Sequence, residues 1–128
     1  MRLIKGRANA SSKLATETFT GEVWSDGVLM DDDFVRVNNV IFTPCARTYW
    51  HYHEQGQILQ VFRGRGFVCS EGQEPVELNE GDTVWVPGGE KHWHGGAKDS
   101  LLGHTAISLG ATTWLQEVTE EEYGAAAH

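Results

Sequence analysis

Two histidines placed two residues apart, His51 and His53, are the first candidates for chemistry in this 128-residue chain. In a β-strand, side chains at i and i+2 lie on the same face, so these two imidazoles can bind one metal ion. Gly56 can turn the chain, and Gln57 on the returning strand can then bring an amide oxygen to the same place. A polar strand end with two surface histidines has the same pattern, so a metal site needs a further ligand.

A second block, residues 81–94, offers that ligand. Its apolar strand is followed by a turn, Pro87-Gly88-Gly89, and by His92 at the start of a new strand. Three imidazoles and one oxygen donor leave a coordination position open for water or substrate, as in catalytic metal sites. Such a set suits a divalent first-row ion, with manganese, iron, nickel and zinc all compatible. The predicted metal ligands are His51, His53, Gln57 and His92.

The amide of Gln57 has a consequence for the chemistry. A carboxylate ligand would cancel one charge of a divalent ion, whereas a neutral amide leaves about the full double charge. The ion would then be a stronger Lewis acid and a better host for an alkoxide or a carboxylate. We therefore expect a small-molecule substrate with an oxygen function.

The last long strand carries a candidate base, His104. One face of this strand holds Leu102, His104, Ala106 and Ser108, and the other face is mostly bulky and apolar. A histidine among small residues suits a strand that faces an open pocket, where it can act as a proton shuttle near neutral pH. A structural histidine held by hydrogen bonds is the alternative.

Three further side chains lie close to the expected ligands in the sequence. His94 has the strand parity of His92 and is either a hydrogen-bonding partner of the site or a packed neighbour. Tyr49 has the parity of the first two ligand histidines and is predicted to line the same interior. Arg47 is either a binding residue for an anionic substrate or a surface arginine.

Short apolar runs between glycine-rich turns predict an all-β protein, a sandwich or a barrel. The expected strands cover residues 18–24, 34–43, 47–53, 57–63, 67–70, 76–78, 83–86 and 101–109. Ser25-Asp26-Gly27 is expected to end the first of them, and Gly64-Arg65-Gly66 is expected to form a tight turn.

The two ends of the chain have different patterns. Residues 1–16, with a loop signal at residues 9–12, form an arm that is either mobile or paired with a partner subunit. Near the other end, Thr119 and Glu122 fit a capping box. The box predicts a short C-terminal helix at about residues 120–124, within the segment 117–124.

Composition narrows the class of protein. A length of 128 residues fits a single domain, 1–128, and a net charge of −8 argues against nucleic acid and against an anionic membrane surface as partners. The two cysteines, Cys45 and Cys69, are too few for a secreted disulfide framework, so we expect buried free thiols. No apolar stretch has the length of a signal peptide or of a membrane span, which makes the cytoplasm the default location.

The two histidine blocks together resemble the sequence motifs of the cupin superfamily. In the first motif, Cys45 takes the usual glycine position, Gln57 takes the usual glutamate position and Gly64 closes the motif. The second motif is matched by Gly81, Pro87, Gly89 and His92, with Gly96 where asparagine is usual. The resemblance implies a jelly-roll β-barrel with its core at about residues 34–110, and assembly as a homodimer or homotetramer.

Within that superfamily the chain is similar to small bacterial cupins with manganese-dependent hydroxynitrile lyase activity. The similarity lies in segments 46–53, 56–57, 89–95 and 104–108 and in the ending 114–119. It implies manganese as the ion, the same four ligands and His104 as the base that deprotonates a cyanohydrin before cyanide leaves. Cys45, Asn38 and Ser108 depart from the pattern. The residues expected to line the substrate pocket are Asn38, Val40, Tyr49, His94 and Ser108.

Two other classes of function use the same ligands. A cupin dioxygenase or a sugar-acid isomerase is the enzymatic alternative, and a non-catalytic metal- or ligand-binding cupin is the other. Substrate identity therefore stays open between a small cyanohydrin and a related oxygenated compound.

Overall fold

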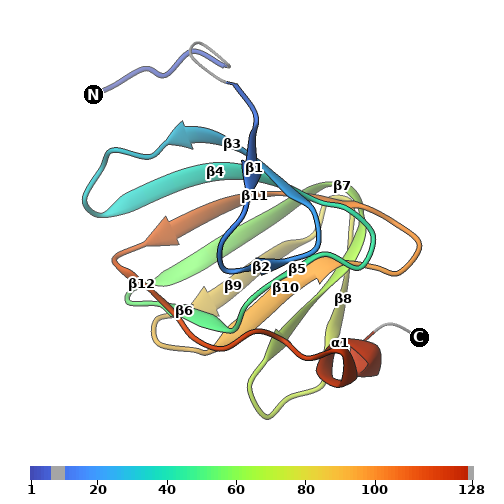
Figure 1. Ribbon diagram of the computed structural model, residues 1–128. Helices are drawn as coiled ribbons and strands as arrows, with labels where there is room; N and C mark the ends of the chain where they lie inside the picture. Colours follow the sequence, from blue (N-terminus) through green and yellow to red (C-terminus); the bar gives the residue numbers. More distant parts are fainter. Residues whose placement is uncertain (7–10, 127–128) are drawn as a thin grey trace.

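The computed structural model describes residues 1–6 and 11–126 and forms a nearly closed antiparallel β-barrel with one short helix (Figure 1). The elements are β1 (Lys13–Ala15), β2 (Phe19–Thr20), β3 (Val23–Leu29), β4 (Val35–Phe42), β5 (Arg47–Thr48), β6 (His51–His53), β7 (Gly56–Ser70), β8 (Val76–Asn79), β9 (Thr83–Pro87), β10 (His92–Gly96), β11 (Leu102–Leu109), β12 (Thr112–Trp114) and α1 (Glu120–Ala126). The all-β prediction is confirmed. Among the described residues, no helix has the length and apolar character that crossing a membrane requires.

The long strand β7 connects the two halves of the barrel. Its first half pairs with β9 and β11, and its second half pairs with β8 and β10. The predicted tight turn at residues 64–66 is therefore wrong, because the strand continues through it. Gly64 has φ of +73°, and a Cβ there would overlap the carbonyl oxygen of Leu101. These glycines let another segment approach closely within a strand, which sequence alone does not distinguish from a turn.

Strands β4 and β11 form the wall that faces the interior cavity. Their antiparallel register sets His104 opposite Val40 and Ser108 opposite Arg36. Because side chains alternate along a strand, all four of these residues point to the same face. Away from these side chains, a cluster of buried apolar residues fills the barrel interior. The largest of its members are Phe42, Leu59, Leu78 and Leu102.

Strand β3 runs through the predicted break at Ser25-Asp26-Gly27 and ends only at Leu29. The ladder with β4 overrides the local turn signal, and the Ser25 hydroxyl donates a hydrogen bond of 2.8 Å to the side-chain oxygen of Asn38. In the N-terminal arm, β1 pairs with β3 of the same chain. Residues 7–10, which include part of the predicted loop signal, lie outside the described residues.

The predicted capping box is present at the start of α1. The Thr119 N–H donates to a Glu122 carboxylate oxygen at 3.0 Å, and the Glu122 N–H donates to the Thr119 hydroxyl at 3.1 Å. The helix continues to Ala126, beyond the predicted end at 124, because Tyr123 and Ala126 are buried against Trp93 and its neighbours. Packing thus extends a helix that local sequence signals would end at Gly124.

Arg47 holds the C-terminal segment against the barrel, so both sequence interpretations of it are wrong. Only 2% of the residue is exposed, and its guanidinium donates to the carbonyl oxygens of Cys45 and Val118, each at 3.1 Å. It also donates to Glu120 at 3.0 Å and lies 4.6 Å from the centre of the Tyr123 ring. A buried guanidinium requires such partners, and here two backbone carbonyls, a carboxylate and an aromatic ring supply them.

The two cysteines are free, but only Cys69 is buried as predicted. Cys45 is exposed and has φ of 72°, in the left-handed region that disfavours residues with a Cβ. That backbone conformation explains why glycine is the usual residue at this point of the motif.

Candidate metal centre

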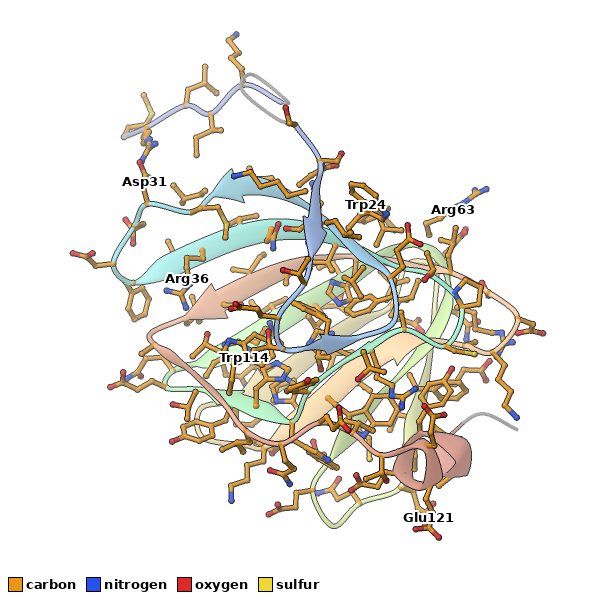
Figure 2. The ribbon with its side chains drawn as sticks, viewed as in Figure 1. Trp24, Asp31, Arg36, Arg63, Trp114 and Glu121 are labelled. Carbon is orange, nitrogen blue, oxygen red and sulfur yellow. The ribbon has the colours of Figure 1, made fainter. Side chains whose placement is uncertain are left out.

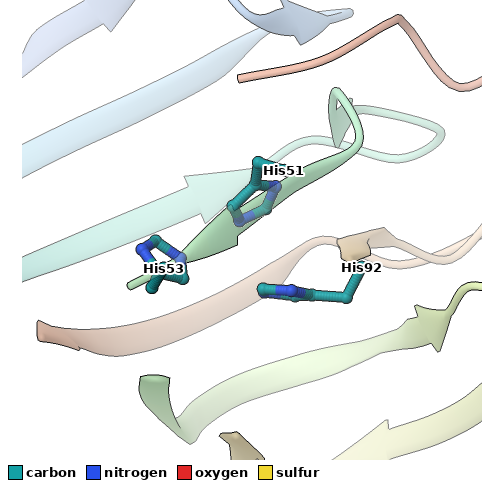
Figure 3. A group of neighbouring side chains, drawn as sticks. All are labelled: His51, His53 and His92. Carbon is teal, nitrogen blue, oxygen red and sulfur yellow. The ribbon is translucent and has the colours of Figure 1, made fainter. Parts of the chain in front are cut away.

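Three buried imidazoles converge in the barrel interior (Figure 3). Strand β6 places His51 and His53 on one face, and its antiparallel pairing with β10 sets His92 directly opposite His51. One ring nitrogen from each of the three lies within 4.8 Å of the other two. The structure thus brings together the three histidines of the predicted ligand set, which come from two distant segments.

Backbone and hydroxyl partners fix the orientation of the three rings. The Nδ1 atoms of His51 and His92 lie 2.9 Å from the carbonyl oxygens of Tyr49 and Glu90. A carbonyl oxygen only accepts, so each Nδ1–H donates and the Nε2 lone pair remains free for a metal. His53 Nδ1 lies 2.9 Å from the Thr112 hydroxyl, and its buried Nε2 has no partner among the described residues.

Gln57 adds an oxygen to this group. Its amide N–H donates to the Ser108 hydroxyl at 3.0 Å, which turns the carbonyl oxygen toward His92. That oxygen lies 3.0 Å from His92 Nε2, although both atoms are hydrogen-bond acceptors when His92 Nδ1 donates to Glu90. Two acceptors at this distance need a cation or a proton between them, and a metal ion bound by both meets that need. The residues present therefore fit a divalent ion.

Burial favours the neutral, metal-binding form of these histidines. It lowers the pKa of His51 well below the ordinary value, with the nearby His92 adding to the effect. The pKa of His92 is also lowered by burial. Burial lowers the pKa of His53 to about 4, and the nearby His92 and the charge of Arg36 add to this shift. All three imidazoles are thus in the neutral form near pH 7, which leaves one nitrogen lone pair on each ring available.

A cavity of about 280 Å³ lies beside this group of side chains. Two of them, His51 and His53, line it together with Gln57, whereas His92 is not among the lining residues. Among the predicted pocket residues, the structure places four on the cavity wall: Asn38, Val40, His94 and Ser108. The cavity can therefore hold a small molecule beside the metal ligands.

Tyr49 is the predicted pocket residue that does not line the cavity. It falls in the break between β5 and β6, so strand parity does not carry across to it. Its contribution is the backbone carbonyl that orients His51.

His104 and His94 form a second buried pair in the same cavity. His104 Nε2 lies 2.9 Å from His94 Nδ1, and neither His104 Nδ1 nor His94 Nε2 has a partner among the described residues. Burial lowers the pKa of His104 to about 4 and that of His94 well below the ordinary value, with His104 adding to the latter shift. Both rings are therefore neutral near pH 7, and the N–H proton of one of them lies in the hydrogen bond between His104 Nε2 and His94 Nδ1.

Several cavity residues were not predicted from the sequence. Trp114 packs on His51 with ring centres 4.6 Å apart, and Thr112 orients His53, because β12 pairs with β6 across about sixty residues of sequence. No local signal identifies such a pairing. Arg36 also lines the cavity, and the strand parity that it shares with Asn38 would have revealed it.

Comparison with known proteins places these features in context. A model of the cupin domain family matches residues 38–102. The chain is 39% identical over 129 residues to a protein from Granulicella tundricola called (R)-mandelonitrile lyase, covering 96% of this chain and 98% of that protein. The crystal structure of a cupin-like protein from Thermotoga maritima is similar with a TM-score of 0.87 and 41% identity, covering 95% of this chain and 97% of that one.

A more distant structural relative shares only the fold. The structure of a polyketide cyclase from Streptomyces resistomycificus superposes with a TM-score of 0.74 at 16% identity, over 96% of this chain and 90% of that one. The barrel architecture alone therefore does not determine the reaction, which depends on the side chains of the site.

Proposed function

The chain belongs to the cupin domain family, and from this premise we propose that it is a metal-dependent lyase acting on a small cyanohydrin or a related oxygenated compound. Similarity over nearly the full length to a protein called (R)-mandelonitrile lyase supports this activity. The observation that carries the proposal is the shared cavity, since two of the ligand histidines, Gln57 and His104 line the same space. A substrate held there contacts both the metal centre and a potential base.

The resident ion is manganese in this proposal, with iron, nickel or zinc as alternatives, and its ligands are His51, His53, Gln57 and His92. When bound, a divalent ion supplies Lewis acidity that lowers the pKa of a substrate hydroxyl group. All four ligand side chains are neutral. The protein therefore adds no negative charge at the centre that would oppose an anionic leaving group.

The His104–His94 pair takes the hydroxyl proton. With a hydrogen bond from His104 Nε2 to His94 Nδ1, the unpartnered His104 Nδ1 carries a lone pair and can accept the proton. The positive charge can then pass along the shared hydrogen bond to His94. Because both rings are neutral at pH 7, the pair is in the state that a base requires.

The atoms and electrons of the step balance without any further reactant. As the proton leaves, the hydroxyl oxygen forms a carbonyl group, and the C–C bond to the nitrile carbon breaks. The electron pair of that bond leaves with cyanide. The proton held by the histidine pair then joins cyanide to give hydrogen cyanide, which returns the pair to its neutral form.

His104→Ala in metal-loaded protein tests this role. The rate of benzaldehyde release from (R)-mandelonitrile is expected to fall by about 10²- to 10⁴-fold, the usual contribution of a general base, with metal content unchanged by elemental analysis. Thr105→Ala, which alters the opposite face of β11, is the matched control. Unchanged cleavage by His104→Ala would remove His104 from the mechanism.

Other outcomes with the wild-type protein favour the alternatives. Oxygen consumption by the iron-loaded form without cleavage of the nitrile favours a dioxygenase, and activity on unsaturated uronates favours an isomerase. Metal binding without turnover of any of these compounds favours a binding protein.

We also propose that the protein assembles as a homodimer or homotetramer through the outer face of the β3–β4–β11–β7–β9 sheet. Three large aromatic residues on this face are exposed: Trp24 (38%), Phe62 (49%) and Trp85 (55%). Exposed apolar patches of this kind commonly mark interfaces. Light scattering after size-exclusion chromatography should give a mass of at least two chains, reduced by Phe62→Glu. A single-chain mass for the wild type at micromolar concentration would contradict this assembly.

A further inference from the structure

Arg36 is a charged residue on the inner face of the barrel. Strand β4 points Arg36, Asn38, Val40 and Phe42 into the cavity, and the register with β11 sets Arg36 opposite Ser108. Figure 2 shows Arg36 beneath the β4 ribbon, on the side toward Trp114, which also lines the cavity. The guanidinium is thus part of the wall of the candidate active site.

No acidic side chain among the described residues neutralises the charge of Arg36. No Asp or Glu is among the residues that line the cavity, and Arg36 forms no ion pair with any described residue, although the chain carries 18 acidic residues. Its hydrogen bonds go to two neutral acceptors, the carbonyl oxygen of Gly110 and the Thr112 hydroxyl, the latter at 3.4 Å. Both bonds use Nη2, so the other guanidinium nitrogens have donors available.

Arg36 is also connected to the candidate metal centre through one side chain, that of Thr112. The Thr112 hydroxyl that accepts from Arg36 lies 2.9 Å from Nδ1 of His53. A small molecule in the cavity of about 280 Å³ can therefore contact both the guanidinium and the ligand side chains that line the cavity. The neutral ligand set and Arg36 together give this space a net positive charge once a divalent ion is bound.

We propose that the substrate carries a carboxylate that pairs with Arg36, so that the reacting compound is an aldehyde acid or keto acid, or its cyanohydrin. This inference rests on the proposed lyase function and names its substrate class. Nε and Nη1 of Arg36 take no part in the bonds to Gly110 and Thr112, so each can donate a charge-assisted N–H···O bond to a carboxylate, and partial burial strengthens such bonds. A neutral aromatic cyanohydrin leaves this charge without a partner, so it is a poorer ligand for the same site.

Two substrates that differ only in charge test the proposal: the cyanohydrins of 4-formylbenzoate and of 4-formylbenzamide. In the manganese-loaded wild type, kcat/KM is expected to be at least about 10-fold higher for the carboxylate, the smallest effect typical of a charge-assisted hydrogen bond. In Arg36→Gln, kcat/KM for the carboxylate should fall about 10- to 100-fold more than that for the amide, chiefly through KM. Arg36→Lys should restore part of the preference for the carboxylate substrate.

The matched control is Arg63→Gln, because Arg63 is an exposed arginine of β7 that lies outside the cavity (Figure 2). It should behave as the wild type with both substrates. Equal losses for both substrates in Arg36→Gln would overturn the proposal and assign Arg36 to the shared cyanide group or to the structure of the site. Nearly equal kcat/KM values for the carboxylate and the amide substrate in the wild type would also overturn it.

Direct binding separates failure of this inference from failure of the proposed lyase activity. Calorimetric titration of manganese-loaded protein with 4-formylbenzoate and 4-formylbenzamide needs no turnover. Tighter binding of the carboxylate that Arg36→Gln abolishes supports anion recognition even if no cyanohydrin is cleaved. Equal binding of the two compounds, beside active cleavage of the neutral substrate, would refute the anion site and leave the lyase function standing.

Discussion

His104 is a buried group whose replacement should change the acid stability of the protein. It is fully enclosed, with 0% of the residue exposed, and burial lowers its pKa to about 4. In the unfolded chain a histidine titrates near 6.5. As the pH falls below 6.5, the unfolded chain takes up a proton that the folded protein does not, so folding stability present above that pH is lost toward pH 4.

The size of this loss follows from the two pKa values. The lowering from 6.5 to about 4 corresponds to about 3 kcal/mol once the pH is below both values. Between pH 7 and pH 5, most of the unfolded chains become protonated at this position and few of the folded ones do. The contribution of His104 over this interval is then about 2 kcal/mol.

His104→Gln removes the titrating group and keeps a polar side chain beside His94. Urea unfolding of metal-free protein in the presence of a chelator, at pH 7 and pH 5, gives the change in unfolding free energy. The wild type should lose about 2 kcal/mol more than His104→Gln over this interval. Thr105→Ala, which alters no titratable group, should keep the wild-type pH dependence. Parallel curves for the wild type and His104→Gln would refute a neutral, buried His104 and weaken its assignment as a base.

Three further changes have expected outcomes. Cys45→Gly should increase the free energy of unfolding by up to about 1 kcal/mol, because glycine adopts the positive φ of 72° without strain. Urea unfolding measures this change, and a lower midpoint concentration of urea would contradict it. Ser108→Ala should weaken manganese binding about 10-fold in chelator competition, since Gln57 loses the hydroxyl that orients its amide; unchanged affinity would show that this contact is dispensable. Arg47→Met should cost about 3 kcal/mol and speed amide exchange in α1, because carbonyl groups such as that of Val118 lose their donor; wild-type exchange would refute this role.

The ligand histidines could be predicted from the sequence because their geometry is local. His51 and His53 lie two apart on one short strand, and His92 begins the strand that pairs with it. The alternation of β11 likewise indicated that His104 and Ser108 share a face, and the structure sets both on the cavity wall. Regular strand geometry carries such information over a few residues.

The parts that sequence did not reveal depend on irregular backbone or on distant pairing. Tyr49 does not line the cavity as predicted, because the chain is not a regular strand between β5 and β6. Thr112 reaches His53 only through the β6–β12 pairing, which no short motif encodes. Arg47 looked like a surface or substrate residue because its partners, such as Val118, lie about seventy residues away. Long-range contacts therefore decided the roles of single polar residues.

The most direct test of the account is a crystal structure of manganese-loaded protein with anomalous diffraction data. A single anomalous peak is expected among four atoms, Nε2 of His51, Nε2 of His53, Nε2 of His92 and Oε1 of Gln57, each about 2.0–2.3 Å from it. His92→Ala should lose the peak while the barrel stays folded. An absence of any peak at this position in fully loaded wild-type protein, or a peak coordinated by other residues, would contradict the metal centre on which the proposed chemistry depends.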